Sequence, residues 1–246
     1  MTGLDIVLLP EELKNKDISD CLVVVIDVLR ASSTITTALH YGAEKIIPVY
    51  MPEQARARAN EYPAESVLLC GERNGAKLAG FNLGNSPLEY NNYKIKGKII
   101  LLTTTNGVKA IEMAKSAKEI IVGSFLNNKA VSEHCLSYAG KVLLVCAGDR
   151  GNVSLEDTVC AGMIRSSCAY QLYKNDYHFD DSTVASIIYR DSGSDLIAMM
   201  KKSVWGNHLI EMGLKDDIAF CAQKNIYNII PIIKGDSIIV KDKLVN

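Results

Sequence analysis

The chain has 246 residues, a formal net charge of −1, 48% hydrophobic residues and 22% charged residues. This length can bury a full core as one domain or as two closely packed lobes. Lysine and arginine are dispersed, which excludes a long basic segment for binding a nucleic-acid backbone. Apolar runs such as residues 21–26 are far too short to cross a membrane. The charged first twenty residues are unlike a signal peptide.

Seven cysteines are scattered along the chain, and no CxxC pair is present. This pattern is typical of reduced thiols in the core of a protein from a reducing compartment. It favours neither a zinc ribbon nor a dithiol redox site. We therefore expect a soluble cytoplasmic protein that acts on a small molecule and binds neither nucleic acid nor membrane. The residues are compatible with a homodimer but do not decide the oligomeric state.

Strands are expected to alternate with helices over most of the chain. Short apolar runs bounded by turn residues are typical of buried parallel strands, and they occur at residues 6–9, 22–26, 46–49, 67–70, 99–102, 120–122 and 142–146. Helices are expected from a cap at Ser32 or Ser33 to about Tyr41, and then at residues 52–62, 108–114, 129–138 and 156–173. The alternation predicts an α/β fold, layered α/β/α around a mostly parallel sheet.

The remaining segments are less regular. Residues 71–86 contain four glycines and polar side chains, which indicates a binding loop. After Asn175 the pattern predicts helices near residues 184–188, 196–200 and 218–221. Residues 229–233 and 238–240 resemble either a hairpin or terminal edge strands. We expect residues 1–246 to form one catalytic unit, with 1–120 and 121–246 as the lobes if it is divided.

Four polar clusters follow expected strands, at residues 27–34, 71–75, 103–107 and 148–151 with 156–157. Ligands of open α/β sheets bind beyond the carboxyl ends of the strands. We therefore expect acids, arginines, hydroxyls and glycines to gather at one edge of one sheet. Such a composition suits an anion held together with a metal ion.

Asp27 stands directly after a buried strand and before a helix. In phosphoryl-transfer sites this position commonly holds a magnesium ligand or an aspartyl nucleophile. A helix-capping role is the other interpretation, but Ser32 to Thr34 already offer caps. An aspartyl-phosphate mechanism of the haloacid-dehalogenase type expects a second Asp two residues later, where this chain has Leu29, so that mechanism is disfavoured.

Other residues in the clusters have the chemistry of anion binding. Arg30 and Arg73 are planar donors matched to phosphate, sulfonate or carboxylate. Residues 103–107 combine threonines with a helix start, which can form an anion site or an ordinary cap. Glu156 and Asp157 are adjacent, so on a helix they diverge by about 100°. Asp149 and Arg150 are consistent with a simple turn.

The sequence lacks the motifs that would indicate several other kinds of site. There is no GxxxxGK[ST] phosphate loop and no GxGxxG dinucleotide motif. The four histidines are not at metal-ligand spacings, which argues against zinc. Oxygen ligands without clustered histidines favour Mg²⁺.

Taken together, the clusters resemble those of the 2-phosphosulfolactate phosphatase family. The matching stretches are Asp27-Val-Leu-Arg-Ala-Ser-Ser-Thr34, Gly71-Glu-Arg-Asn-Gly75, Gly80-Phe-Asn-Leu-Gly-Asn-Ser-Pro87, Thr104-Thr-Asn-Gly107, Ala147-Gly148 with Glu156-Asp157, and residues 213–217. They occur in order from Asp27 to about Cys221 and are jointly specific. The resemblance implies an α/β enzyme that uses Mg²⁺ to release phosphate from 2-phospho-3-sulfolactate, a step in coenzyme M biosynthesis.

The resemblance also implies roles for residues of this chain. The candidate catalytic acids are Asp27, Glu72 and Glu156, and the candidate metal ligands are Asp27, Glu156 and Asp157. The candidate substrate-binding residues are Arg30, Ser33, Thr34, Arg73, Asn85, Ser86, Thr105 and Asn106. The expected mechanism is in-line attack by a metal-activated water, with Glu72 or Glu156 as the acid. The alternatives are a haloacid-dehalogenase-like phosphatase and a non-enzymatic regulator that binds an anionic metabolite.

Overall fold

The computed structural model describes residues 1–172, 183–192 and 194–241, and over these residues it confirms an α/β fold. The strands are β1 (Gly3–Val7), β2 (Leu22–Ile26), β3 (Lys45–Pro48), β4 (Val67–Arg73), β5 (Ala76–Lys77), β6 (Ile99–Thr103), β7 (Glu119–Gly123), β8 (Lys141–Cys146), β9 (Pro231–Lys234) and β10 (Ser237–Val240). The helices are α1 (Ala31–His40), α2 (Pro52–Ala59), α3 (Asn92–Ile95), α4 (Gly107–Met113), α5 (Asn128–Ser137), α6 (Leu155–Leu172), α7 (Thr183–Ser192), α8 (Leu196–Lys202), α9 (Val204–Glu211) and α10 (Lys215–Cys221).

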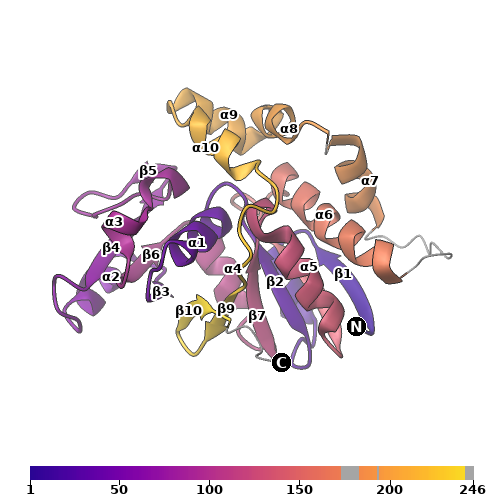
Figure 1. Ribbon diagram of the computed structural model, residues 1–246, viewed down its shortest axis with the longest axis horizontal. Coiled ribbons are helices and arrows are strands. Elements are labelled where there is room, and N and C mark those ends of the chain that lie inside the picture. The colour runs from indigo at the N-terminus through magenta and orange to yellow at the C-terminus, as the bar shows by residue number, and fades with distance from the viewer. Residues whose placement is uncertain (173–182, 193, 242–246) are drawn as a thin grey trace.

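All ten strands belong to one sheet, in the order β1-β8-β2-β7-β9-β10-β3-β6-β4-β5. It contains two parallel sets, β1-β8-β2-β7 and β3-β6-β4. The antiparallel hairpin β9–β10 joins them, and it confirms the expected hairpin near the end of the chain. In Figure 1 this hairpin lies at the lower edge, with the two sets to its left and right, while α8, α9 and α10 lie above them.

The hairpin changes how the polar clusters come together. Three successive antiparallel pairings separate β7 from β3, so the two parallel sets run in opposite senses along the sheet. The clusters therefore do not share one edge of a uniformly parallel sheet, as the sequence had suggested. Residues at or after the carboxyl ends of β2, β4 and β6 nevertheless line one pocket.

The core confirms the layered arrangement. Successive side chains of a strand point to opposite faces. Val23 and Val25 of β2 pack into one buried cluster, with α1 and α4, while Leu22, Val24 and Ile26 pack into another, with α5, α6 and α9. Helices therefore cover both faces of the sheet. None of the described helices combines the length and the apolar character needed to cross a membrane.

One local expectation needs correction. The segment expected as a loop at residues 71–86 begins as strand, because β4 continues to Arg73 and pairs with β5. Residue 120, the suggested boundary between two lobes, lies within β7, which pairs along its whole length with β2.

Candidate active site

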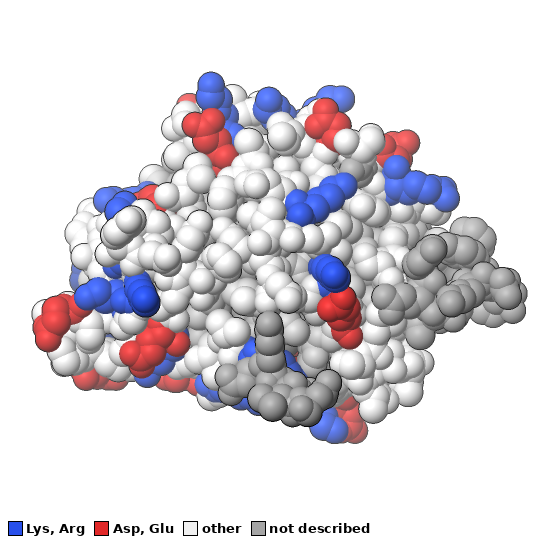
Figure 2. Space-filling view, viewed as in Figure 1, with Lys and Arg blue, Asp and Glu red and all other residues white. Residues whose placement is uncertain are grey.

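A small pocket lies where the ends of β2, β4 and β6 approach α9. Its lining residues are Asp27, Leu29, Arg30, Glu72, Asn85, Thr104, Thr105, Asn106 and Trp205. The cavity volume is about 10 Å³, which is room for about one water molecule. Two larger grooves, of about 550 and 630 Å³, lie elsewhere and have no buried acidic side chain among their lining residues. On the face shown in Figure 2, surface charges of both signs are interspersed.

Asp27 lies in this pocket at the start of α1 and is 8% exposed. Its Oδ1 accepts a hydrogen bond from the Ala31 N–H at 3.2 Å, so Asp27 itself supports the helix start. The cap expected from Ser32 or Ser33 is not formed; Ser32 Oγ instead donates to the Asp27 carbonyl at 2.7 Å. Burial raises the pKa of Asp27 to about 7, with further contributions from Glu72 and Glu156 against the Ala31 hydrogen bond.

Glu72 organises the pocket from the end of β4. Its Oε2 accepts the Gly75 N–H at 2.8 Å, and its Oε1 accepts the N–H and hydroxyl of Thr105 at 2.8 and 2.9 Å. Both carboxylate oxygens are therefore engaged by fixed donors. This arrangement joins the turn after β4 to the segment that precedes α4. The hydroxyl of Thr105, which was predicted to bind substrate, is therefore hydrogen-bonded to Glu72.

Asp157 and Glu156 diverge at the start of α6, as expected for adjacent helical residues. Both oxygens of Asp157 accept backbone N–H groups, from Val28 at 2.8 Å and Gly148 at 3.2 Å. Burial and the charges of Asp27 and Glu156 raise its pKa well above the usual range. Burial also raises the pKa of Glu156, against hydrogen bonds from its own backbone and from the Ser203 and Ser154 hydroxyls.

Arg30 forms a buried ion pair at the pocket wall. Its Nη1 lies 2.6 Å from Asp217 Oδ2, and its Nη2 donates to the Gly75 carbonyl at 2.6 Å. The Ser86 hydroxyl donates to the other oxygen of Asp217 at 2.5 Å. Two predicted substrate residues, Arg30 and Ser86, are thus held by an aspartate that had not been chosen from the sequence. In the sequence, Asp217 was indicated only by its position within residues 213–217, one of the stretches that resemble the family.

Two predicted hydroxyl ligands are engaged within the fold. Ser33 Oγ donates to the Val28 carbonyl at 2.8 Å, and Thr34 Oγ1 donates to the Asn85 carbonyl at 2.7 Å. The side chain of Asn85 differs from these. It is 4% exposed, lines the pocket, and its Oδ1 has no hydrogen-bond partner among the described residues. A buried polar atom without a partner is costly, so Asn85 is well placed to contact a bound molecule.

The structure does not bring Arg73 into the pocket. Its guanidinium lies over the ring of Tyr50, 5.8 Å from the centroid, and donates to the Tyr50 and Glu72 carbonyls. Asn106 does line the pocket, where its amide contacts Asp149 and the backbone of Arg150, both at 3.4 Å. Trp205 was not chosen from the sequence, because its role depends on how α9 packs over the pocket.

The donor set can be compared with what a metal ion requires. Within the described residues, no three His, Cys, Asp or Glu side chains converge as a complete metal site. Mg²⁺ is usually bound through one or two carboxylates together with waters and substrate phosphates. Asp27 fits that requirement, because it is buried and lines the pocket, whereas Glu156 is buried but is not among the pocket-lining residues. Asp157 fits it less well, because both of its oxygens already accept backbone hydrogen bonds.

Comparison with known proteins decides the family. A family model described as 2-phosphosulpholactate phosphatase matches residues 7–236. The chain belongs to this family. It is 46% identical over 220 residues to a probable 2-phosphosulfolactate phosphatase of Thermotoga maritima, covering 89% of this chain and 92% of that protein. It is 36% identical over 228 residues to a protein of the same description from Clostridium acetobutylicum, covering 93% and 96%.

Proposed function

We propose that this protein is a Mg²⁺-dependent phosphatase that hydrolyses 2-phospho-3-sulfolactate to 3-sulfolactate and phosphate. The observation that carries the proposal is the pocket of buried Asp27, Glu72, Arg30 and Asn85 in a chain that matches the family over residues 7–236. The polar lining suits a small, highly charged substrate. We also propose that the reaction is a step of coenzyme M biosynthesis and that it takes place in the cytoplasm.

Asp27, which lines the pocket, is the residue that would hold the metal ion, together with waters and the substrate phosphate. A bound Mg²⁺ would neutralise charge on the phosphate and lower the pKa of a water molecule. Asp157 has a different part, because its hydrogen bonds to the Val28 and Gly148 N–H groups hold the loop after β2 in place. It therefore positions the neighbouring Asp27 without needing a free oxygen of its own.

The acid that protonates the leaving alkoxide must carry a proton near neutral pH. Glu72 is poorly suited, because three fixed donors already engage both of its oxygens. Burial raises the pKa of Glu156, which favours a protonated carboxyl. We therefore assign proton donation to Glu156 and a positioning role to Glu72, which narrows the choice that the sequence had left open.

The substrate's charges need donors that are already in place. Arg30 retains donors beyond the two that bind Asp217 and Gly75, because a guanidinium carries five N–H groups. The unpartnered Oδ1 of Asn85 is an acceptor, so it suits a water molecule or a metal ion rather than the anion itself. Such preorganised groups stabilise charge in the transition state more effectively than water does.

The proposal is tested by phosphate release from 2-phospho-3-sulfolactate with and without Mg²⁺. EDTA should abolish release and added Mg²⁺ should restore it. Asp27→Asn should lower kcat by about 100-fold or more, because the amide removes the ligand's charge. It should keep its melting temperature, because the amide fills the same space and can still accept the Ala31 hydrogen bond.

The matched control is Asp20→Asn at an exposed position, which should leave kcat unchanged. Full activity in EDTA or in Asp27→Asn would refute the metal assignment. A trapped aspartyl-phosphate at Asp27 would support the haloacid-dehalogenase-like alternative. Binding of the substrate without any turnover in Mg²⁺ would support the regulator.

A further inference from the structure

A tight turn after β8 presents Arg150 in an uncommon conformation. The N–H of Asp149 donates to the Asn152 carbonyl at 2.8 Å, and the N–H of Asn152 donates to the Asp149 carbonyl at 2.9 Å. The two residues between them have positive φ, +49° at Arg150 and +83° at Gly151. Turns of this kind normally have Asn, Asp or Gly at both central positions. An arginine is costly there, and strained positions of this sort cluster at functional sites.

The side chain of Arg150 lies at the mouth of the pocket. Its guanidinium lies over the ring of Trp205, 5.8 Å from the centroid, and its Nη2 donates to Asn74 Oδ1 at 3.0 Å. Its Nε also lies 3.9 Å from Asp149 Oδ1, in a half-exposed ion pair. The Arg150 N–H contacts Asn106 Oδ1 at 3.4 Å. Trp205 and Asn106 both line the pocket. Because the Arg150 side chain is 54% exposed, part of its donor edge remains open to a ligand.

The charges of the pocket-lining residues favour an additional cationic side chain close to the pocket. Arg30 is the only cation among the described residues that line the pocket, and its charge is balanced by Asp217 at 2.6 Å. The proposed substrate carries three acidic groups, a phosphate, a carboxylate and a sulfonate. A second guanidinium near the pocket would balance the charge of an acid that Mg²⁺ does not bind, and Arg150 has a planar donor set that suits three-oxygen anions.

We propose that Arg150, held by Trp205 and Asn74, forms a subsite that binds the sulfonate of the substrate. This inference rests on the proposed function. The carboxylate is attached directly to the carbon that carries the phosphate ester, whereas the sulfonate is one carbon farther out. With the phosphate beside Asp27, the sulfonate is the acid that reaches the mouth of the pocket, where Arg150 lies.

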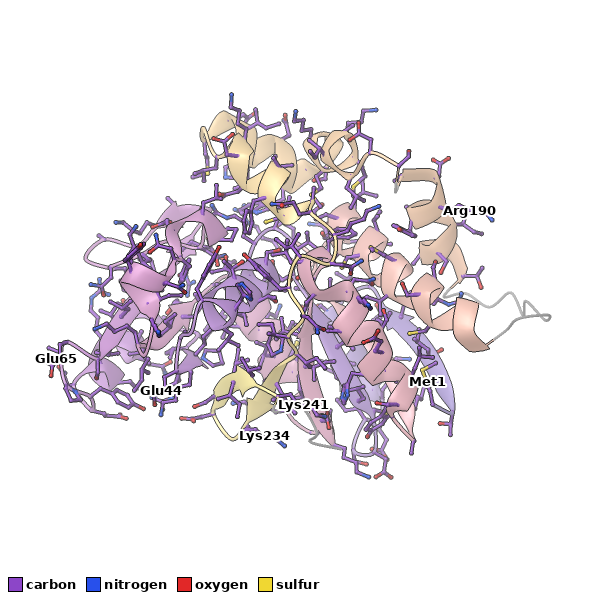
Figure 3. The ribbon with its side chains drawn as sticks, viewed as in Figure 1. Met1, Glu44, Glu65, Arg190, Lys234 and Lys241 are labelled. Atoms are coloured by element: carbon purple, nitrogen blue, oxygen red, sulfur yellow. The ribbon has the colours of Figure 1, made fainter. Side chains whose placement is uncertain are left out.

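The test compares two substrates in Mg²⁺, 2-phospho-3-sulfolactate and 2-phospholactate, which lacks the sulfonate. Arg150→Asn should lower kcat/KM for the first by about 10- to 100-fold, mainly through KM, because charge-assisted hydrogen bonds are lost. For the second, kcat/KM should change by less than about twofold. The control Arg190→Asn changes an arginine on the outer side of α7 (Figure 3) and should alter neither value.

Stability gives an independent readout of the same variant. Asn tolerates positive φ better than Arg does, so Arg150→Asn should raise Tm by about 2–4 °C while it lowers selectivity. If Arg150→Asn lowers kcat/KM equally for both substrates, or for neither, the sulfonate subsite is overturned. The proposal that the protein is a phosphatase is not affected by that result. If the unmodified protein releases phosphate from neither substrate, the proposed function fails and the subsite fails with it.

Discussion

Asp217 holds Arg30 at the wall of the pocket through an ion pair between side chains only 2% and 3% exposed. The two residues are 187 positions apart in the sequence. Asp217 also accepts the hydroxyl of Ser86, so one carboxylate fixes two residues that were expected to contact the substrate. Burying the pair is expensive, and its benefit is to hold the arginine in one orientation.

This arrangement predicts a large loss of stability when Asp217 is removed. Asp217→Ala should lower the free energy of unfolding by about 3–5 kcal/mol, because Arg30 is left as a buried charge without its partner. Urea denaturation measures the loss. The neighbouring Asp216 is exposed, so Asp216→Ala should cost well under about 1 kcal/mol. Similar small losses for both variants would contradict the role given to Asp217.

At the scale of single elements, the end of β4 shapes the pocket. Its last residues, Glu72 and Arg73, are adjacent in an extended strand and must point to opposite faces. Glu72 therefore faces the pocket and Arg73 faces Tyr50. The sequence suggested that the strand ended at residue 70, so this alternation could not be applied and both residues were assigned to the site.

The close packing of β4 against β6 makes Gly71 sensitive to substitution. Gly71 has a φ of +142°, and a Cβ at this position would lie 2.0 Å from the Thr103 carbonyl oxygen. Gly71→Ala should lower the free energy of unfolding by about 2–4 kcal/mol, because backbone atoms must shift. It should also lower kcat, because a shift of the backbone at Gly71 displaces the next residue, Glu72, which lines the pocket.

Gly3→Ala is the matched control, because an added Cβ at Gly3 meets nothing within 4 Å. Chemical denaturation measures the free energy of unfolding of the two variants. If Gly71→Ala is as stable as Gly3→Ala, the packing of β4 on β6 described above is wrong.

At the scale of the whole molecule, local patterns predicted the elements better than their assembly. Buried apolar runs predicted the central strands, because β2, β6 and β8 have nearly continuous apolar sequences. The insertion of β9–β10 between two parallel sets depends on a pairing of distant segments, which periodicity does not reveal. The family resemblance suggested the hydroxyls of Ser33 and Thr34 as substrate groups, and the sequence could not show that each already donates to a backbone carbonyl.

The most direct measurement of the central claim is phosphate release in Mg²⁺ from a series of phosphate esters at equal concentration. Removing the sulfonate should leave Arg150 without its ligand, and removing a further acid should leave donors of the buried Arg30 without a partner, which costs more than the lost contact area. We predict that kcat/KM for 2-phospho-3-sulfolactate exceeds that for 2-phospholactate by on the order of tenfold or more. Phosphoglycolate should be poorer still, and sugar phosphates and nucleotides poorest. A sugar phosphate or nucleotide hydrolysed best would contradict the proposed substrate.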